Sequence, residues 1–199
     1  AAINSAVKVQ VQRIYTKDEQ INALAAIAGA YTNRRVRVIF PDTYKNGSVT
    51  KNGYFMAASL AGLRSGVVPH QGLTNIQVLG ATDLSKTISD FSEAQLNTLA
   101  AAGVWIVTQS VVGATPYTRQ QLTTDSSSLN TSEDSITTNV DSISYGLQAV
   151  LSPFIGAYNV NPGTVLLIRA AIDNELKFRQ LNTEVARAGA QLIGYTITN

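Results

Sequence analysis

The chain has few residues that could carry out chemistry, and acid–base catalysis would depend on its single histidine, His70. A Ser-His-Asp arrangement would have to be built on this side chain, because the chain has no other histidine. No cysteine is present to act as a nucleophile instead. His70 lies between Pro69 and Gln71 in a predicted loop, and the chain contains no nucleophile-elbow sequence. We therefore interpret His70 as a loop or interface residue and expect the protein not to be an enzyme.

Carboxylates occur in two groups, neither of which has a catalytic pattern. Glu133 and Asp134 are adjacent, so on a helix they point to different faces and do not easily share a substrate. Their place in the first turn of a predicted helix favours a role in compensating the helix dipole. The second group is interpreted as a solvated helix face, with a salt bridge to a neighbouring subunit as the alternative, and consists of Asp173, Glu175, Lys177 and Arg179.

Phosphate and nucleic-acid binding are also disfavoured. Arg34, Arg35 and Arg37 form the only basic cluster, and neither further basic residues nor interleaved aromatic residues accompany it. No P-loop is present, no G-x-G-x-x-G sequence opens a helix, and Gly113 and Ala114 belong to a predicted hairpin turn. The lack of cysteine removes cysteine-based metal sites. We expect no cofactor, no metal site and no nucleic-acid partner.

The composition is typical of a protein that buries its surface against neighbours. The 199-residue chain has a net charge of +2 and 14% charged residues, against about 25% in average soluble proteins. Serine, threonine, asparagine and glutamine fill the difference, and such a neutral polar surface suits contact with other subunits. No apolar run approaches the ~18 residues of a membrane span, so no membrane anchoring is expected.

Strand and helix signals alternate along the first part of the chain. Val7, Val9 and Val11 alternate with polar residues, which predicts a strand over 7–12. A capping box at Thr16 opens a helix. The other predicted elements are a strand over 35–40, a loop over 41–52 with a turn at 45–48, a helix over 54–65, a strand over 76–79, a helix from Ser92 that Gly103 ends, a buried strand over 104–109 and a hairpin turn at 111–114 leading into 115–122.

The predicted helix over 54–65 is rich in small residues. Ala57, Ala58, Ala61 and Gly62 occupy positions where larger side chains are usual, so we expect another backbone to approach closely there. Gly66 is placed to end this helix in the left-handed conformation.

The second part of the chain has longer helices. Its predicted elements are a helix that begins at Glu133 and Asp134 and ends at Pro153, a helix that begins with Asn161 and Pro162 and runs to about Ala188, and a strand over 191–198. The fold class is therefore α/β, a mostly parallel β-sheet with helices packed on it, followed by a β-α-α-β C-terminal subdomain. We expect the domains to be 1–112 and 113–199.

Small-residue motifs follow one another in a definite order from about residue 53 onward. Residues 53–80 read GYFMAASLAGLRSGVVPHQGLTNIQVLG, and LNTLAAAGV at 96–104 and YTRQQLTTD at 117–125 come next, before the helical segments 145–156 and 166–193. In this order they resemble the core and C-terminal portion of the contractile phage tail sheath protein family. The family's proteins are longer, so the resemblance implies that the chain corresponds to part of such a protein.

The resemblance implies a structural subunit of a contractile tail sheath. Such a subunit polymerises around an inner tail tube as hexameric rings stacked helically, and the sheath contracts to drive the tube through the host envelope. The implied partners are the inner tail tube protein and the baseplate and tail terminator proteins. The implied location is the phage tail of the virion, after synthesis in the bacterial host cytoplasm. The alternation of strands and helices leaves open an alternative, a Rossmann-like α/β ligand-binding module or enzyme.

The two terminal strands are the candidate contacts between subunits. They are interpreted either as strands of the chain's own sheet or as arms that pair with the sheet edge of another copy, as the resemblance implies. The candidate interface residues are Val7, Val9, Val11, Leu192, Tyr195 and Ile197.

Overall fold

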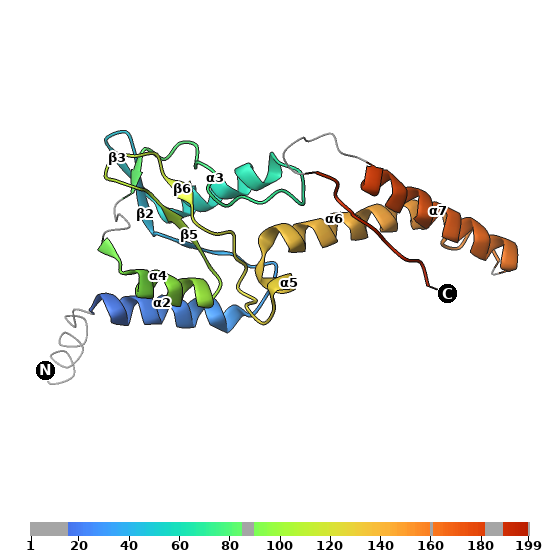
Figure 1. Cartoon of the computed structure of the whole chain (residues 1–199), viewed down its shortest axis with the longest axis horizontal. Helices are drawn as coiled ribbons and strands as arrows, with labels where there is room; N and C mark the ends of the chain where they lie inside the picture. Colours follow the sequence, from blue (N-terminus) through green and yellow to red (C-terminus); the bar gives the residue numbers. More distant parts are fainter. Residues whose placement is uncertain (1–15, 85–89, 160, 182–188, 199) are drawn as a thin grey trace, which may run out of the picture.

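The computed structural model describes residues 16–84, 90–159, 161–181 and 189–198. Over these residues, a body of helices and small sheets carries a long projection made of two helices (Figure 1). The C-terminal segment, residues 189–198, runs along this projection (Figure 1). The predicted strand over 7–12, with the candidate residues Val7, Val9 and Val11, lies outside the described residues.

Two three-stranded sheets form the β part of the body. The first has the order β1-β5-β6 and consists of β1 (Val38–Phe40), β5 (Val104–Thr108) and β6 (Tyr117–Thr118). The second has the order β3-β2-β4 and consists of β3 (Val49–Asn52), β2 (Thr43–Asn46) and β4 (Asp83–Leu84). Among the described strands, β1 and β5 pair in parallel and the other pairs are antiparallel. The mixed α/β class is confirmed, but a mostly parallel sheet is not.

Strand β5 is the centre of the core because both of its faces are covered. Its five residues are all buried, and alternate side chains point to opposite faces. Trp105 and Val107 pack with Met56 and Leu60 of α3 (Gly53–Ser65). On the other face lie α2 (Lys17–Tyr31) and α4 (Glu93–Ala101), in a cluster that consists of Ile21, Ala28, Leu96, Leu99, Val104 and Ile106. The body therefore has three layers, with α3 on one side of β5 and α2 and α4 on the other (Figure 1).

Local sequence signals position the helices of the body as predicted. The Thr16 side chain accepts a hydrogen bond from the backbone N of Glu19, whose carboxylate accepts one from the backbone N of Thr16. Ser92 closes an equivalent capping box at the start of α4. Gly103 follows the end of α4 with φ of +76°, where a Cβ would also overlap the backbone of Thr123. A glycine is therefore required at the turn that leads into β5.

Two predictions about loops and strands in this half are wrong. The predicted loop over 41–52 contains the antiparallel hairpin of β2 and β3, with Gly47 at positive φ in its turn. Apart from Tyr44 and Val49, its strands consist of polar residues, so no apolar alternation predicted them. The predicted strand over 76–79 is reduced to a single bridge between Gln77 and Tyr117.

The small residues of α3 do not lie at a close contact. The helix buries Met56 and Leu60, whereas Ala58, Ala61 and Gly62 are exposed. A Cβ placed on Gly62 would meet no atom within 4 Å. The predicted tight packing is therefore wrong, and the small residues leave open space on the surface of α3.

The end of α3 also differs from its prediction. Gly66 has φ of −86°, in the right-handed region, and its N–H is shared between the carbonyl oxygens of Gly62 and Leu63. The left-handed cap predicted for Gly66 is therefore wrong. The helix ends in a tightened last turn, which is a common alternative to a glycine cap.

A short helix leads from the body into the projection, which consists of two long helices. In chain order, the helices are α5 (Leu129–Ser132), α6 (Asp134–Leu151), which continues into the 3₁₀ turn η2 (Ser152–Phe154), and α7 (Pro162–Leu181). As predicted, Asn161 caps α7, and its Oδ1 accepts a hydrogen bond of 2.9 Å from the backbone N of Thr164. The predicted continuation of α7 to Ala188 lies outside the described residues. The predicted strand over 191–198 is not confirmed within the chain, because the segment pairs with none of the described strands.

Candidate subunit interface

An arginine–carboxylate pair attaches the projection to the body. Arg35, which precedes β1, donates two hydrogen bonds to Asp141 of α6, with Nε 2.9 Å from Oδ2 and Nη2 2.7 Å from Oδ1. Hydrogen bonding from Arg35 lowers the pKa of Asp141. Two-point contacts of this kind fix orientation as well as distance. They therefore hold α6 in a definite direction relative to the sheet.

Asp134, at the start of α6, is a second attachment point. It is fully buried, and its Oδ1 accepts a 2.7 Å hydrogen bond from Nε of Arg37, next to β1. Its Oδ2 lies 3.7 Å from Nε of Arg64 on α3. The carboxylate thus joins three elements, a role beyond the predicted compensation of the helix dipole. Its neighbour Glu133 is different, because burial raises the pKa of the Glu133 carboxyl group.

Helices α6 and α7 pack closely at Gly146. A Cβ at this position would overlap the guanidinium of Arg179 and the carboxylate of Glu175, both on α7. Arg179 donates from Nε to Oε1 of Glu175 at 2.6 Å and from Nη1 to Oγ of Ser142 at 3.1 Å. The Arg179 and Glu175 side chains are only 12% and 16% exposed. The predicted solvated face is therefore wrong for this pair, which lies between the helices.

Polar side chains of both helices hold the C-terminal segment. Nη1 of Arg179 donates to Oε1 of Gln191 at 2.9 Å, and Nδ2 of Asn139 donates to the Gln191 carbonyl oxygen at 3.2 Å. Nε2 of Gln180 donates to the Ile193 carbonyl oxygen at 3.0 Å. The segment is thus placed by side-chain contacts and not by a β ladder.

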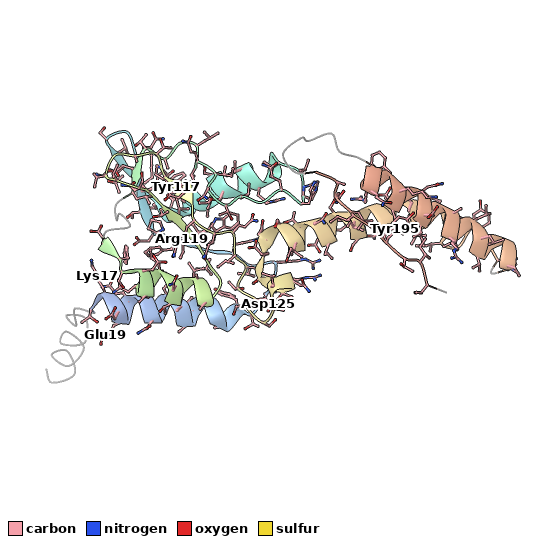
Figure 2. All side chains as sticks on the ribbon, viewed as in Figure 1. Lys17, Glu19, Tyr117, Arg119, Asp125 and Tyr195 are labelled. Carbon is pink, nitrogen blue, oxygen red and sulfur yellow. The ribbon has the colours of Figure 1, made fainter. Side chains whose placement is uncertain are left out.

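Tyr195 fixes the outer part of the segment to α7 (Figure 2). Its hydroxyl donates a 2.6 Å hydrogen bond to Oδ1 of Asp173, whose Oδ2 lies 2.6 Å from Nζ of Lys177. The Lys177 ammonium and then the Tyr195 hydroxyl lower the pKa of Asp173. In turn, the hydrogen bond to Asp173 raises the pKa of Tyr195. The contact therefore depends on an ionised Asp173 and a protonated Tyr195.

The predicted interface residues of this segment lie against their own chain. Leu192, Tyr195 and Ile197 are half-buried along the projection. Ile193, which sequence reasoning did not select, is 93% exposed. Tyr195 and Ile197 also line a hollow of about 390 Å³ beside Leu166 of α7. The residue that faces outwards for a partner in this conformation is therefore Ile193.

The backbone of the C-terminal segment is available for pairing. No backbone–backbone hydrogen bond joins residues 190–198 to any other described part of the chain. Among the described residues, the Gln191 and Ile193 carbonyl oxygens accept hydrogen bonds from side chains. An extended segment with free N–H and C=O groups can add a strand to a sheet edge.

Large apolar side chains lie exposed along the whole projection. On α6, α7 and the segment between them, the exposed residues are Val140, Tyr145, Ile155, Tyr158, Val165, Leu166, Leu167 and Phe178. Many large exposed apolar side chains on one part of a protein are typical of protein–protein contact sites. The sequence signal for it was the run Val165 to Ile168, which exceeds the single stripe that a helix needs to pack on one neighbour.

The described residues hold no arrangement that resembles a catalytic or metal site. Nε2 of His70 lies 3.0 Å from the carbonyl oxygen of Gly189, and Nδ1 has no hydrogen-bond partner among the described residues. His70 therefore contacts the C-terminal segment instead of a serine or aspartate. No group of three or more potential metal ligands occurs in the described ranges. Within the same ranges, no helix has the length and apolar character needed to cross a membrane.

Comparisons with known proteins identify the fold through structure. No protein-family model and no curated protein matches the sequence. The sheath tail protein of Desulfitobacterium hafniense is similar, with 17% identity and a TM-score of 0.62 over 79% of this chain and 43% of that one. A chain of the anti-feeding prophage baseplate is similar with 13% identity and a TM-score of 0.60, over 83% of this chain and 51% of that one.

The contracted helical sheath of the anti-feeding prophage gives a related match, with 15% identity and a TM-score of 0.58, over 73% of this chain and 40% of that one. The chain thus spans about half the length, or less, of the structures it matches. The resemblance read from the order of the small-residue motifs is confirmed, and the chain has the fold of contractile tail sheath proteins.

Proposed function

We propose that the chain is a non-enzymatic, structural subunit of a contractile tail sheath. The observation that carries this proposal is the projection, a rigid pair of helices that exposes apolar side chains on its surface and carries an extended segment with free backbone groups. A monomeric protein would gain nothing from such a surface. In a helical assembly, neighbouring subunits cover it. The likeness to sheath structures supports the same assignment.

In this proposal the subunits form hexameric rings that stack helically around an inner tail tube. The bidentate Arg35–Asp141 pair and the buried Asp134 join the body and the projection into one rigid unit. Contraction therefore moves whole subunits and replaces the contacts between them with new ones. The released free energy drives the tube through the host envelope. Further partners are the baseplate and tail terminator proteins, and the assembled protein is located in the virion tail, after synthesis in the bacterial host cytoplasm.

The C-terminal segment is proposed as an arm between subunits. Pairing of residues 191–198 with a sheet edge of another copy gives several backbone hydrogen bonds, each with a net contribution of about 0.5–1.5 kcal/mol. In that pairing, three side chains that now lie along α7 would either leave it or contact both α7 and the partner subunit. These are the side chains of Leu192, Tyr195 and Ile197. The Ile193 side chain would contact the partner subunit. We assign Val7, Val9 and Val11 to the corresponding arm at the other end of the chain. The proposed domains remain 1–112 and 113–199.

Assembly of the concentrated protein tests this function. Negative-stain electron microscopy is expected to show rings or tubular polymers of the whole chain. Deletion of residues 194–199 is expected to leave a folded monomer, because the contacts of Tyr195 lie at the surface of α7. Circular dichroism reports the fold and sedimentation velocity reports the assembly. The variant Tyr158→Phe, on an exposed ring elsewhere on the projection, is the control that should assemble normally.

The outcomes separate the role of the arm from that of the sheath. Loss of polymers with the fold retained supports both. Polymers that persist after the deletion would remove the arm from the proposal and leave the apolar projection as the assembly surface. Failure of the whole chain to form any polymer, together with turnover of a defined substrate, would contradict the structural function.

A further inference from the structure

The sequence Lys-Asn-Gly occurs twice in the chain, at 45–47 and at 51–53. These are the two places where an asparagine is followed by a glycine. In such a pair the backbone nitrogen of the glycine can attack the asparagine side chain, because the glycine has no side chain of its own to obstruct the approach. Since the three residues are identical, a difference in reactivity between the two copies has to come from the structure around them.

The reaction converts an asparagine to an acid without an enzyme, which makes asparagine one of the thermolabile residues. The glycine nitrogen loses its proton and forms a bond to Cγ of the asparagine, and the side-chain nitrogen leaves as ammonia. Water then opens the resulting five-membered imide ring. Opening at Cγ gives aspartate, and opening at the backbone carbonyl carbon gives isoaspartate, in which the main chain continues through Cγ. One water is consumed, one ammonia is released, and both products carry a new carboxylate.

The first copy lies in the open turn of a hairpin. Asn46 pairs with Val49 at the end of the β2–β3 ladder, and Gly47 begins the turn between them. Asn46, Gly47 and Ser48 are exposed, and a Cβ placed on Gly47 would meet no atom within 4 Å. The hairpin lies at the end of the body away from the projection (Figure 1). The Asn46 side chain and the Gly47 backbone therefore have room to approach one another.

The second copy lies where β3 ends and α3 begins. Asn52 pairs with Thr43 in the ladder and is also the N-cap residue of α3. Gly53 packs against the backbone of Asp42, because its N–H donates to the Asp42 carbonyl oxygen at 2.5 Å and a Cβ would lie 2.8 Å from the same oxygen. The Gly53 nitrogen can attack only when this junction of strand and helix opens, and such local opening costs free energy.

A hydroxyl group restrains the first copy. The Gly47 N–H donates a 2.8 Å hydrogen bond to Oγ1 of Thr82, which immediately precedes β4. Thr82 is itself anchored, since its backbone N and its hydroxyl donate to the Lys45 carbonyl oxygen at 2.8 and 3.1 Å. The proton that the Gly47 nitrogen must lose is thus the one that Thr82 accepts. The reaction requires this hydrogen bond to break, so the Thr82 hydroxyl should slow it.

We propose that Asn46 is a site of spontaneous deamidation in the folded chain, that Asn52 is protected by its packing, and that the Thr82 hydroxyl slows the reaction at Asn46. The product has a carboxylate next to Lys45, whose Nζ lies 3.3 Å from Oδ2 of Asp83. The isoaspartate form also adds a carbon atom to the main chain and so disturbs the short turn that joins β2 to β3. This modification does not depend on assembly of a sheath.

Peptide mass spectrometry tests the proposal. The whole chain is incubated at mildly alkaline pH, which favours loss of the glycine N–H proton, and is then digested briefly with trypsin. Trypsin cleaves after Lys45 and Lys51, so the two asparagines fall in separate peptides. Tandem spectra locate each change from amide to acid. We expect Asn46 to react at least about tenfold faster than Asn52. In urea that unfolds the chain, the two should react at similar rates.

Two matched substitutions test the role of Thr82. Thr82→Val removes the hydroxyl that accepts from Gly47, and it is expected to speed deamidation of Asn46 about two- to tenfold. Thr50→Val removes a hydroxyl at an exposed position of β3 and leaves the contact between Gly47 and Thr82 in place. It should leave the rate at Asn46 unchanged. Circular dichroism confirms that both variants fold.

Three results would overturn the proposal. The first is an equal rate at the two asparagines of the folded chain, which would mean that the packing of Gly53 gives no protection. The second is the absence of an acid product at Asn46 of the folded chain under conditions in which the unfolded chain reacts. The third is an equal rate at Asn46 in the Thr82→Val and Thr50→Val variants, which would leave the Thr82 hydroxyl without the proposed role.

Discussion

The guanidinium of Arg179 on α7 occupies the space that a side chain at Gly146 of α6 would fill. The same guanidinium donates to Glu175 on its own helix, to Ser142 on α6 and to Gln191 in the C-terminal segment. One arginine therefore forms hydrogen bonds with α7, α6 and the C-terminal segment. Glycine at position 146 leaves the space that the guanidinium needs.

Gly146→Ala is expected to destabilise the chain by about 1 kcal/mol. The new methyl group shifts the Arg179 guanidinium and breaks one hydrogen bond of this charged donor, worth about 1.5–3 kcal/mol. Replacing a mid-helix glycine with alanine stabilises the helix by about 1 kcal/mol, which offsets part of this loss. Chemical denaturation measures the difference.

A double-mutant cycle isolates the cause of this effect. In an Arg179→Ala background the clash with the guanidinium is gone and the Glu175 carboxylate, which Arg179 no longer holds, is free to move away from position 146. Gly146→Ala should then become stabilising by up to about 1 kcal/mol through helix propensity. The same loss of stability in both backgrounds would show that Arg179 is not what the alanine displaces.

The adjacent carboxylates Glu133 and Asp134 are expected to respond very differently to neutralisation. Asp134→Asn leaves Arg37 and Arg64 without a buried counter-charge and should cost about 3–5 kcal/mol. Glu133→Gln keeps an acceptor for Gln121 and removes a carboxylate whose pKa burial has raised. Its stability at neutral pH should therefore be unchanged or slightly higher. Equal losses for the two variants in urea denaturation would contradict this reading of Asp134.

The contrast between these two residues illustrates which features a sequence can predict. The starts of α2 and α4 were predictable, because the capping box is a contact between residues three positions apart. Strand β5 was predictable from its unbroken apolar run. The burial of Asp134 was not, since it depends on two arginines about 70 and 100 positions earlier in the chain.

The same limit explains the errors at the surface. The small residues of α3 are compatible with a tight contact or with open space, and only the placement of neighbouring elements decides between them. In the C-terminal segment the alternating pattern is present, but the backbone has no described strand beside it. A strand-like pattern shows that a segment can pair with another strand, but it does not determine which strand that is.

Contact between the C-terminal segment and α7 is expected to depend on pH through Tyr195 and Asp173. The pKa of Tyr195 is raised above its ordinary value of 10.0, so the contact is fully present below that value and is lost as the pH rises through the raised pKa. The pKa of Asp173 is lowered from 3.8, so the contact is present above that value and is lost as the pH falls through the lowered pKa.

A spin label can follow this release, because the chain contains no cysteine to compete with one introduced by Thr198→Cys. Label mobility should be low at neutral pH and should rise in an alkaline step. Tyr195→Phe should make the label mobile already at neutral pH and abolish the alkaline step. Tyr158→Phe is the control and should leave the profile unchanged. An alkaline step that survives in Tyr195→Phe would assign the release to another group.

The apolar surface of the projection gives the last prediction. Leu166→Glu introduces a charge at an α7 position that is 67% exposed, so the stability of the isolated subunit should change by less than about 0.5 kcal/mol. Assembly should fail, because a carboxylate would be buried without a partner wherever a neighbouring subunit covers this side chain. Leu129→Glu, at a 72% exposed position on α5, is the matched control and should assemble normally. Sedimentation velocity and electron microscopy compare the two variants. Polymers of normal length from Leu166→Glu would exclude this part of α7 from the contacts between subunits.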